Sequence, residues 1–369
     1  MKADIELELQ LKNRKEKGGY RYLKKSDNRM IDFSSNDYLG LAKIKEIHNH
    51  SVNFIDNGAA GSRLLSGNKN YHEELEAYLA DFFKADSALL FNSGYVANLG
   101  VLSSVPQKGD TVLMDELSHV CIKEGVRLGR AKYFNFKHND IKDLEIKIQK
   151  ADGNVFIVVE SVYSMDGDQA PLRDIVEIAE KYEAAVIVDE AHSTALYGKA
   201  GFGLSCDLGL ENKIFARIYT FGKAAGAHGA AVCGSRTLKE YLINYSRQFI
   251  YTTALPFHSV NTIKNGLKYR RDNPELWEDL KLKIQLFQSQ LSQNVTSLDS
   301  SHPIQGIISE DAKSTVEFAD YLNQSGFDIR PILSPTVPKG KERVRICLHA
   351  FNSEEEITNL CQHINQYFQ

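Results

Sequence analysis

The sequence lacks the cysteine patterns of disulfide-stabilised and zinc-binding proteins. Its five cysteines are scattered along 369 residues, and none of them forms a C-x-x-C pair. Disulfide frameworks and structural zinc sites rely on paired or clustered cysteines, and disulfides persist in oxidising compartments. We therefore expect a protein of the reducing cytoplasm, without a disulfide framework and without a metal site.

Long apolar runs and a large charge of one sign are also missing. No run approaches membrane-spanning length, and residues 1–17 alternate acidic with apolar residues instead of forming the apolar core of a signal peptide. The formal net charge of −4 gives no general attraction for nucleic acid or for an anionic membrane. We expect a soluble protein with neither of these as partner, so any phosphate binding must be local.

What the sequence does contain is an alternation of short apolar runs with helical segments. Residues 155–159 and 185–188 are fully apolar, and a helical pattern at 172–182 separates them. Such alternation is typical of βαβ units and predicts an α/β fold with a mostly parallel sheet. Residues 260–291 have the pattern of one or two long helices, and shorter strands and helices follow. We expect an N-terminal arm (1–45), a large domain (46–259), and a linker helix with a small α/β domain (260–369).

One lysine stands in the most distinctive stretch, TFGKAAGAHG. Lys223 follows a β-branched and aromatic run (214–221) and precedes a tract of small residues, which is the pattern of a strand ending in an uncrowded turn. Small neighbours allow a planar group to approach, and a buried lysine can form a Schiff base with a carbonyl. An isolated lysine is normally solvated. The residues upstream decide between these two interpretations.

Upstream, Asp189 ends the apolar run 185–188, and His192 follows three residues later. Ligands of open α/β sheets bind at the carboxyl ends of the strands, so both side chains are expected to face one site. A carboxylate there can keep a pyridine nitrogen protonated, which makes a pyridoxal ring an electron sink. The sequence therefore predicts a pyridoxal 5'-phosphate site in which His192 hydrogen-bonds the phenolic oxygen and Lys223 forms the Schiff base.

A phosphate site is predicted where residues 87–91, a short apolar strand, run into a helix. The turn between them contains Ser93, Gly94 and Tyr95. A helix amino terminus leaves backbone N–H groups free, and its dipole favours anions. These three residues are the predicted phosphate cradle, although S-G-Y alone is also common in ordinary turns.

The motifs D-E-A-H (189–192) and T-F-G-K (220–223), with FSSNDYLGL at 33–41 and RVRICLHA at 343–350, resemble the α-oxoamine synthases. Members of that family are pyridoxal-phosphate enzymes of fold type I that condense an amino acid with an acyl thioester and release carbon dioxide. The resemblance implies a large, mostly parallel-sheet domain, a smaller C-terminal α/β domain, and a homodimer with shared active sites.

The resemblance also implies roles for residues that pattern alone leaves open. His119, in the motif S-H, would stack on the pyridoxal ring, and Ser164 would reach the phenolic oxygen or the substrate. Thr220 would bind the cofactor, and Thr253 would touch the cofactor phosphate of the partner subunit. Arg345, the second arginine of R-x-R, would bind the substrate carboxylate, whereas Arg343 could be a surface charge. The other substrate-binding positions implied are Arg21, Asn36 and Thr336.

Within the family, T-V-P-K-G at 336–340 most resembles the branch that serves biotin biosynthesis. That branch joins L-alanine to a pimeloyl thioester of coenzyme A or acyl carrier protein. Lys223 would remove the Cα proton while Asp189, His119 and His192 hold the ring and the reacting oxygens. Two alternatives stay open. One is a sister synthase that uses glycine with acetyl-CoA or serine with a long acyl thioester. Serine palmitoyltransferases also have a serine at the position that corresponds to Ser193. The other is a cofactor-binding regulator without turnover.

Overall fold

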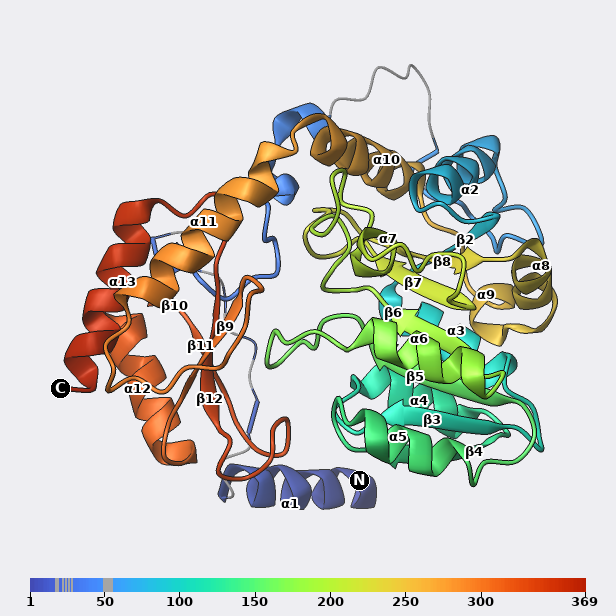
Figure 1. Cartoon of the computed structure of the whole chain (residues 1–369). Helices are drawn as coiled ribbons and strands as arrows, with labels where there is room; N and C mark the ends of the chain where they lie inside the picture. The colour runs from blue at the N-terminus through green and yellow to red at the C-terminus, as the bar shows by residue number, and fades with distance from the viewer. Residues whose placement is uncertain (17–19, 22, 24, 26, 28, 49–55) are drawn as a thin grey trace.

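The computed structural model describes residues 1–16, 20, 21, 23, 25, 27, 29–48 and 56–369. Figure 1 shows a larger and a smaller body side by side, joined at one end by helices α10 (Phe257–Asp272) and α11 (Glu275–Gln290). The long helical pattern is thus two helices, and Pro274 begins the second because proline fits the start of a helix but not its interior.

The larger body is built on a seven-stranded sheet with the order β2-β8-β7-β6-β5-β3-β4. Strands β3 to β7 are parallel to their neighbours of that group, and only β8 among the seven runs against both of its neighbours. The prediction of a mostly parallel sheet is confirmed. The strands are β2 (Ser87–Phe91), β3 (Thr111–Asp115), β4 (Lys132–Phe136), β5 (Val155–Glu160), β6 (Ala185–Asp189), β7 (Ala216–Thr220) and β8 (Ala230–Gly234).

Helices cover both faces of this sheet because successive side chains of a buried strand point to opposite sides. In β5, Val158 packs in one apolar cluster with the helices α3 and α4, whereas Val159 packs in the other with α6. The helices of this body are α2 (Asn70–Phe82), α3 (Gly94–Ser104), α4 (Val120–Leu128), α5 (Ile141–Ile148), α6 (Leu172–Lys181), α7 (Leu204–Asp207), α8 (Arg236–Tyr245) and α9 (Arg247–Ile250).

The smaller body has a three-stranded antiparallel sheet, β11 (Arg330–Ile332), β12 (Arg343–Cys347) and β9 (Ile304–Ile308), in that order. Helices α12 (Ala312–Gln324) and α13 (Glu354–Tyr367) pack on it. A two-residue strand near the amino terminus, β1 (Ile31–Asp32), pairs in parallel with β10 (Phe327–Asp328), and two short 3₁₀ turns follow at Leu41–Lys43 and Lys45–His48. This pairing places residues 33–38 between the two bodies, beside the site.

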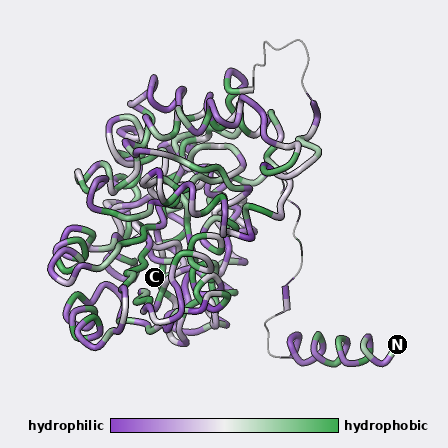
Figure 2. The backbone as a smooth tube through the Cα atoms, turned by 90° about the vertical axis from the view of Figure 1, so that its right-hand side faces the viewer, coloured by the Kyte–Doolittle hydropathy of each residue, from purple (hydrophilic) through white to green (hydrophobic). Residues whose placement is uncertain are grey.

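Helix α1 (Lys2–Glu16) lies apart from the rest of the chain, and none of its residues is buried (Figure 2). The alternation of acidic and apolar residues in this segment thus accompanies an exposed helix. No helix within the described ranges has both the length and the apolarity that crossing a bilayer would need.

The β-branched and aromatic residues of 246–256 by themselves favour a strand, but the segment forms helix α9 and a turn, in which Phe249 packs edge-on against Phe91 of β2 at 5.7 Å between ring centroids. Within it, only Thr253 keeps a strand-like bridge, to Ser62. Residues 327–330 also do not form one strand; they are divided between β10 and β11, which join different sheets.

Candidate active site

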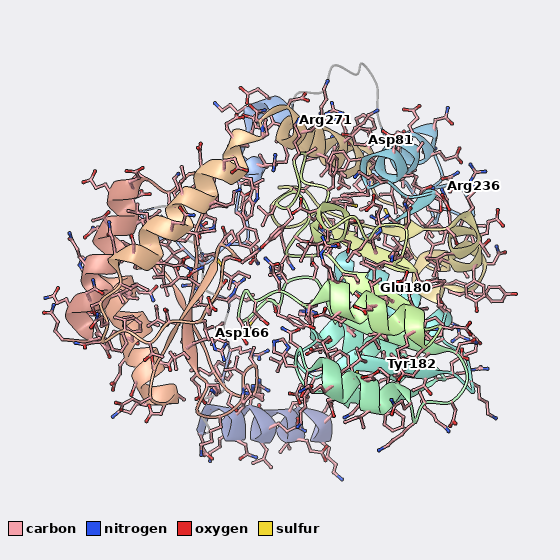
Figure 3. The ribbon with its side chains drawn as sticks, viewed as in Figure 1. Asp81, Asp166, Glu180, Tyr182, Arg236 and Arg271 are labelled. Atoms are coloured by element: carbon pink, nitrogen blue, oxygen red, sulfur yellow. The ribbon has the colours of Figure 1, made fainter. Side chains whose placement is uncertain are left out.

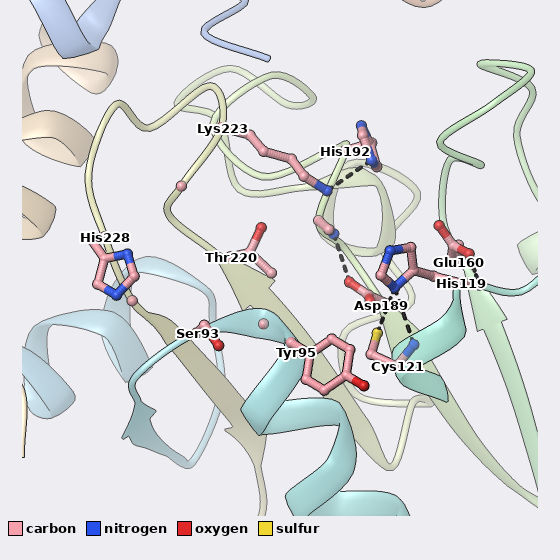
Figure 4. A pocket seen from close by; sticks show the side chains of 14 residues that line it. Ser93, Tyr95, His119, Cys121, Glu160, Asp189, His192, Thr220, Lys223 and His228 are labelled. Atoms are coloured by element: carbon pink, nitrogen blue, oxygen red, sulfur yellow. Dashed lines mark hydrogen bonds between the residues drawn. The ribbon is translucent and has the colours of Figure 1, made fainter. Parts of the chain in front are cut away.

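A cavity of about 240 Å³ opens where β5, β6 and β7 end and where α3 and α4 begin (Figure 4). Parallel strands and helix amino termini meet at this edge of the sheet, which is where open α/β sheets bind ligands. Its lining contains most of the predicted cofactor residues together with others: Ser93, Gly94, Tyr95, His119, Cys121, Glu160, Asp189, Ala191, His192, Thr220, Gly222, Lys223, His228 and Gly229.

Lys223 points into this cavity from the turn after β7 (Figure 4). Its Nζ lies 2.7 Å from Nε2 of His192, whose Nδ1 lies 2.8 Å from the hydroxyl of Tyr38. Burial lowers the pKa of Lys223, although Asp189 and Glu160 act in the opposite direction. Burial also holds the pKa of His192 well below its usual range, and the Lys223 charge adds to this. Both groups are therefore biased toward their neutral, nucleophilic forms.

The carboxylate of Asp189 is held in place by two donors. Its Oδ1 accepts from the backbone N–H of Ala191 at 2.9 Å, and its Oδ2 accepts from the side-chain amide of Asn98 at 2.8 Å. Asn98, on the first turns of α3, also donates to the carbonyl of Gly94 at 3.0 Å. One amide thus ties the carboxylate at the end of β6 to the predicted phosphate turn.

His119 caps the amino terminus of α4. Its Nδ1 accepts from the backbone N–H of Cys121 at 3.2 Å, so the neutral ring carries its hydrogen on Nε2. Its own backbone N–H donates to Glu160 at 2.6 Å. Burial lowers the pKa of His119; the Asp189 charge acts in the opposite direction, whereas the Lys223 charge adds to the lowering. A neutral, fixed imidazole at the cavity wall suits the stacking role that the resemblance implies.

Glu160, at the end of β5, is fully buried beside the cavity, and burial raises its pKa to about 8, with Asp189 adding to the rise. A carboxyl that titrates near neutral pH in a cleft is typical of functional sites. No role for Glu160 was predicted from the sequence, where it only follows the apolar run 155–159.

The residues predicted to bind the phosphate of the cofactor form a site that suits a phosphate group. A Cβ on Gly94 would lie 2.2 Å from Cγ2 of Thr220, so only glycine allows this close approach of α3 and β7. Thr220 Oγ1 is buried and has no hydrogen-bond partner among the described residues. Ser93 caps α3 by accepting from Val96 N–H at 3.3 Å, and the first N–H groups of a helix have no partner within it. An unpaired hydroxyl beside a helix amino terminus suits a phosphate group.

Arg345 reaches the site from β12 of the smaller body. Its Nε donates to the carbonyl of Ser164 and its Nη2 to Oδ1 of Asn36, both at 2.9 Å. The structure therefore brings Arg345, Asn36 and Ser164 together next to Tyr38, although none of the three lines the cavity itself. Ser164 takes part through its backbone carbonyl, whereas its side chain was expected to act.

The remaining predicted residues lie elsewhere. Arg21, Thr253 and Thr336 are exposed and do not line the cavity. Thr253 sits at the bridge to Ser62, and its carbonyl accepts from Asn92. Their predicted roles stay predictions.

Arg343 is not a surface charge. It is buried and forms an ion pair with Asp166, which lies between the two bodies in Figure 3. Asp168, two residues later, accepts from His138 at 2.8 Å and from Asn139 at 2.7 Å. The segment Asp166-Gly167-Asp168 is therefore a turn held by its neighbours, and Gly167 has the positive φ of 72° that a turn needs.

Comparison with known proteins agrees with this geometry. The aminotransferase class I and II family model matches residues 28–364. An 8-amino-7-oxononanoate synthase of Emericella nidulans is 40% identical over 392 residues, covering 97% of this chain and 94% of that protein. A serine palmitoyltransferase structure with a pyridoxal-phosphate internal aldimine superposes with a TM-score of 0.90 at 26% identity, covering 98% of this chain and 96% of that one. The 8-amino-7-oxononanoate synthase of Francisella tularensis gives 0.76 at 27% identity, covering 92% and 98%.

The fold and the cavity define a pyridoxal-phosphate-dependent enzyme of fold type I. The sequence similarity along nearly the whole chain narrows this class to one group of enzymes. The chain belongs to the class I and II aminotransferase family and, within it, to the 8-amino-7-oxononanoate synthases.

Proposed function

We propose that this protein condenses L-alanine with a pimeloyl thioester of coenzyme A or acyl carrier protein. The products are 8-amino-7-oxononanoate, carbon dioxide and the free thiol, and the reaction belongs to biotin biosynthesis. The observation that carries the proposal is the cavity that unites a desolvated Lys223 with Asp189 and His192, in a chain 40% identical to an 8-amino-7-oxononanoate synthase.

Pyridoxal phosphate, when bound, supplies an aldehyde that captures amines and a ring that withdraws electrons from the bond to be broken. The protein's own groups do the rest. Lys223 would hold the cofactor and would serve as the base for the Cα proton of the amino acid. Asp189, fixed by Asn98, holds the proton of the pyridine nitrogen. Ser93, Gly94, Tyr95 and Thr220 bind the phosphate, His119 holds the ring plane, and Ser164 lies toward the substrate side.

The acyl and carboxylate ends are proposed to lie on the Arg345 side. A guanidinium can grip a carboxylate through two parallel hydrogen bonds, and Asn36 lies beside it. Arg21 and Thr336 are proposed to meet the acyl chain. We further propose a homodimer in which Thr253 contacts the partner's cofactor phosphate. Exposed apolar side chains support a second copy here: Tyr95, Leu117 and Val120 at or next to lining residues of the cavity, and Leu64, Leu65 and Tyr251 next to the bridge between Ser62 and Thr253.

The decisive experiment is a spectral titration of the purified holoenzyme with L-alanine, glycine and L-serine, followed by pimeloyl thioester and mass analysis of the product. We expect the strongest response with L-alanine and the mass of 8-amino-7-oxononanoate. Lys223→Ala should abolish turnover. Turnover that survives this substitution would contradict the catalytic assignment of the lysine.

A sister synthase is the second candidate, because the serine palmitoyltransferase structure superposes with the higher TM-score. It would respond best to glycine or L-serine and give no pimeloyl product, with the same cofactor residues.

A further inference from the structure

We propose that Tyr38 sets the tautomer of His192 and thereby ties the arginine end of the site to Lys223. Tyr38 is a positioning residue in this proposal, because it acts on the lysine through the histidine. The inference rests on the proposed attachment of pyridoxal phosphate at Lys223. It adds to that function a route by which binding at Arg345 influences Lys223.

The contacts of Tyr38 place its hydroxyl at a junction. The side chain is fully buried, and its oxygen lies 2.8 Å from Nδ1 of His192 and 3.0 Å from Oδ1 of Asn36. A guanidinium N–H of Arg345 approaches the same oxygen at 3.4 Å. The ring packs edge-on against His302 at 5.2 Å between centroids, which fixes its direction.

One hydroxyl proton faces two acceptors, so the structure allows two arrangements. When Tyr38 donates to His192 Nδ1, the ring hydrogen is on Nε2, which donates to the neutral amine of Lys223. When Tyr38 donates to Asn36, the ring hydrogen is on Nδ1 and is donated to the tyrosine oxygen. Nε2 then accepts from an N–H of Lys223. No proton is gained or lost within the imidazole, and only its position changes.

The surroundings favour the first arrangement in the resting protein. Oδ1 of Asn36 keeps one donor, Arg345 at 2.9 Å, when Tyr38 donates to His192, and Nδ1 of His192 lies nearer to the hydroxyl, at 2.8 Å, than Oδ1 of Asn36 does, at 3.0 Å. The backbone of His192 is held in place, because its carbonyl accepts from Nε2 of His302 at 2.7 Å and Nδ1 of His302 accepts from Ile304 N–H.

Engagement of Arg345 by a carboxylate would draw its N–H groups away from Asn36. The amide oxygen would then take the tyrosine proton, and the second arrangement would follow. His192 Nε2 would change from donor to acceptor. An acceptor at this position favours the protonated form of Lys223, so the lysine becomes more basic. Recognition of the carboxylate would thus be transmitted to the lysine through two side chains.

The test uses the apoenzyme and measures how the rate of covalent attachment of pyridoxal phosphate, followed by absorbance, depends on pH. The midpoint reports deprotonation of Lys223. In Tyr38→Phe the donor that favours the Nε2–H tautomer is lost, so we expect the midpoint to rise by about one pH unit, the size of one hydrogen bond. In Asn36→Ala the competing acceptor is lost, so the midpoint should fall.

Tyr197→Phe is the matched control. Its ring also packs on His302, at 6.3 Å between centroids, and its hydroxyl accepts from Gln169 instead of contacting His192. Its midpoint should equal that of the wild type. The other titratable groups near His192 and Lys223 are the same in all three variants: Asp189, Glu160, Cys121, His119, His302 and Arg345.

An unchanged midpoint in Tyr38→Phe, or a midpoint that does not fall in Asn36→Ala, would overturn the proposal. If Tyr38→Phe does not fold, Asn36→Ala decides alone by the direction of its shift. A wild-type apoenzyme that captures no pyridoxal phosphate at Lys223 would instead overturn the proposed function. The two failures are therefore distinguishable.

Discussion

At the scale of single residues, Asn98 has the clearest untested effect on chemistry. It donates to Asp189 at 2.8 Å while nearly fully buried. Asn98→Ala leaves the carboxylate with one donor fewer, and we expect kcat/KM to fall about ten-fold, the value of one hydrogen bond to a charged group. Steady-state kinetics on the holoenzyme measures this.

Asn154→Ala is the matched control for that prediction. Its amide donates to Asp110 at 2.9 Å, a pair of the same chemistry located where β3 and β5 begin, away from the cavity. If both variants lose the same activity, the effect of Asn98 is general destabilisation.

The sequence predicted that Lys223, Asp189 and His192 face one site because each lies at or just after the end of an apolar strand, and the structure brings the three together. It missed Asn98 and Tyr38 for a physical reason. Asn98 acts from inside a helix and Tyr38 from a segment far away in the chain, and no local pattern encodes contacts made at long sequence separation. Arg343 was misjudged because its partner, Asp166, is equally remote.

At the scale of elements, the close approach of α3 to β7 makes Gly94 sensitive. A side chain there must displace Thr220, whose unpaired hydroxyl is proposed to meet the phosphate. We expect Gly94→Ala to weaken pyridoxal-phosphate binding by about ten-fold or more, because a lost hydrogen bond to a charged group costs roughly 1.5 to 3 kcal/mol. Equilibrium dialysis of the apoenzyme measures this affinity.

Gly58→Ala provides the comparison, since its added methyl group would meet nothing within 4 Å. Equal affinity in wild type and Gly94→Ala would show that the phosphate does not depend on this approach.

The turn after β4 is predicted to make stability depend on pH. Burial alone would lower the pKa of His138, but hydrogen bonds to Asp115 and Asp168 outweigh burial and raise it to about 10. The stabilisation is therefore complete below about pH 6.5 and is lost as the pH rises through about 10. His138→Gln should lower the urea midpoint of unfolding strongly at pH 6 and little above pH 10. If the urea midpoints of the wild type and of His138→Gln differ by the same amount at every pH in this range, the ion pairs of His138 with Asp115 and Asp168 do not stabilise the fold.

The elements themselves were predicted with uneven success. Strands β2, β5 and β6 have continuous apolar runs, and helix α13 has a capping box that marks its start. Strand β8 follows Gly229, is rich in small residues and ends in Gly234, and it was not anticipated because its strand character comes from its two neighbours.

At the scale of the whole molecule, the ion pair of Arg343 with Asp166 joins the two bodies. Arg343→Leu leaves a partly buried carboxylate unpaired, so we expect it to lower the free energy of unfolding by about 1 to 3 kcal/mol. Denaturant unfolding measures the change.

The double variant Arg343→Leu with Asp166→Asn should recover part of that loss, since no charge remains unpaired. Additive losses would mean that the two side chains do not stabilise each other. The division of the chain near residues 45 and 259 stays a prediction that such unfolding experiments can also address.

The position of Arg345 on β12 has a consequence for a chain that is still being made. Every residue that lines the cofactor cavity precedes β8 or lies at its edge, whereas β12 comes much later in the sequence. Translation therefore delivers every residue of the cavity lining before it reaches this arginine.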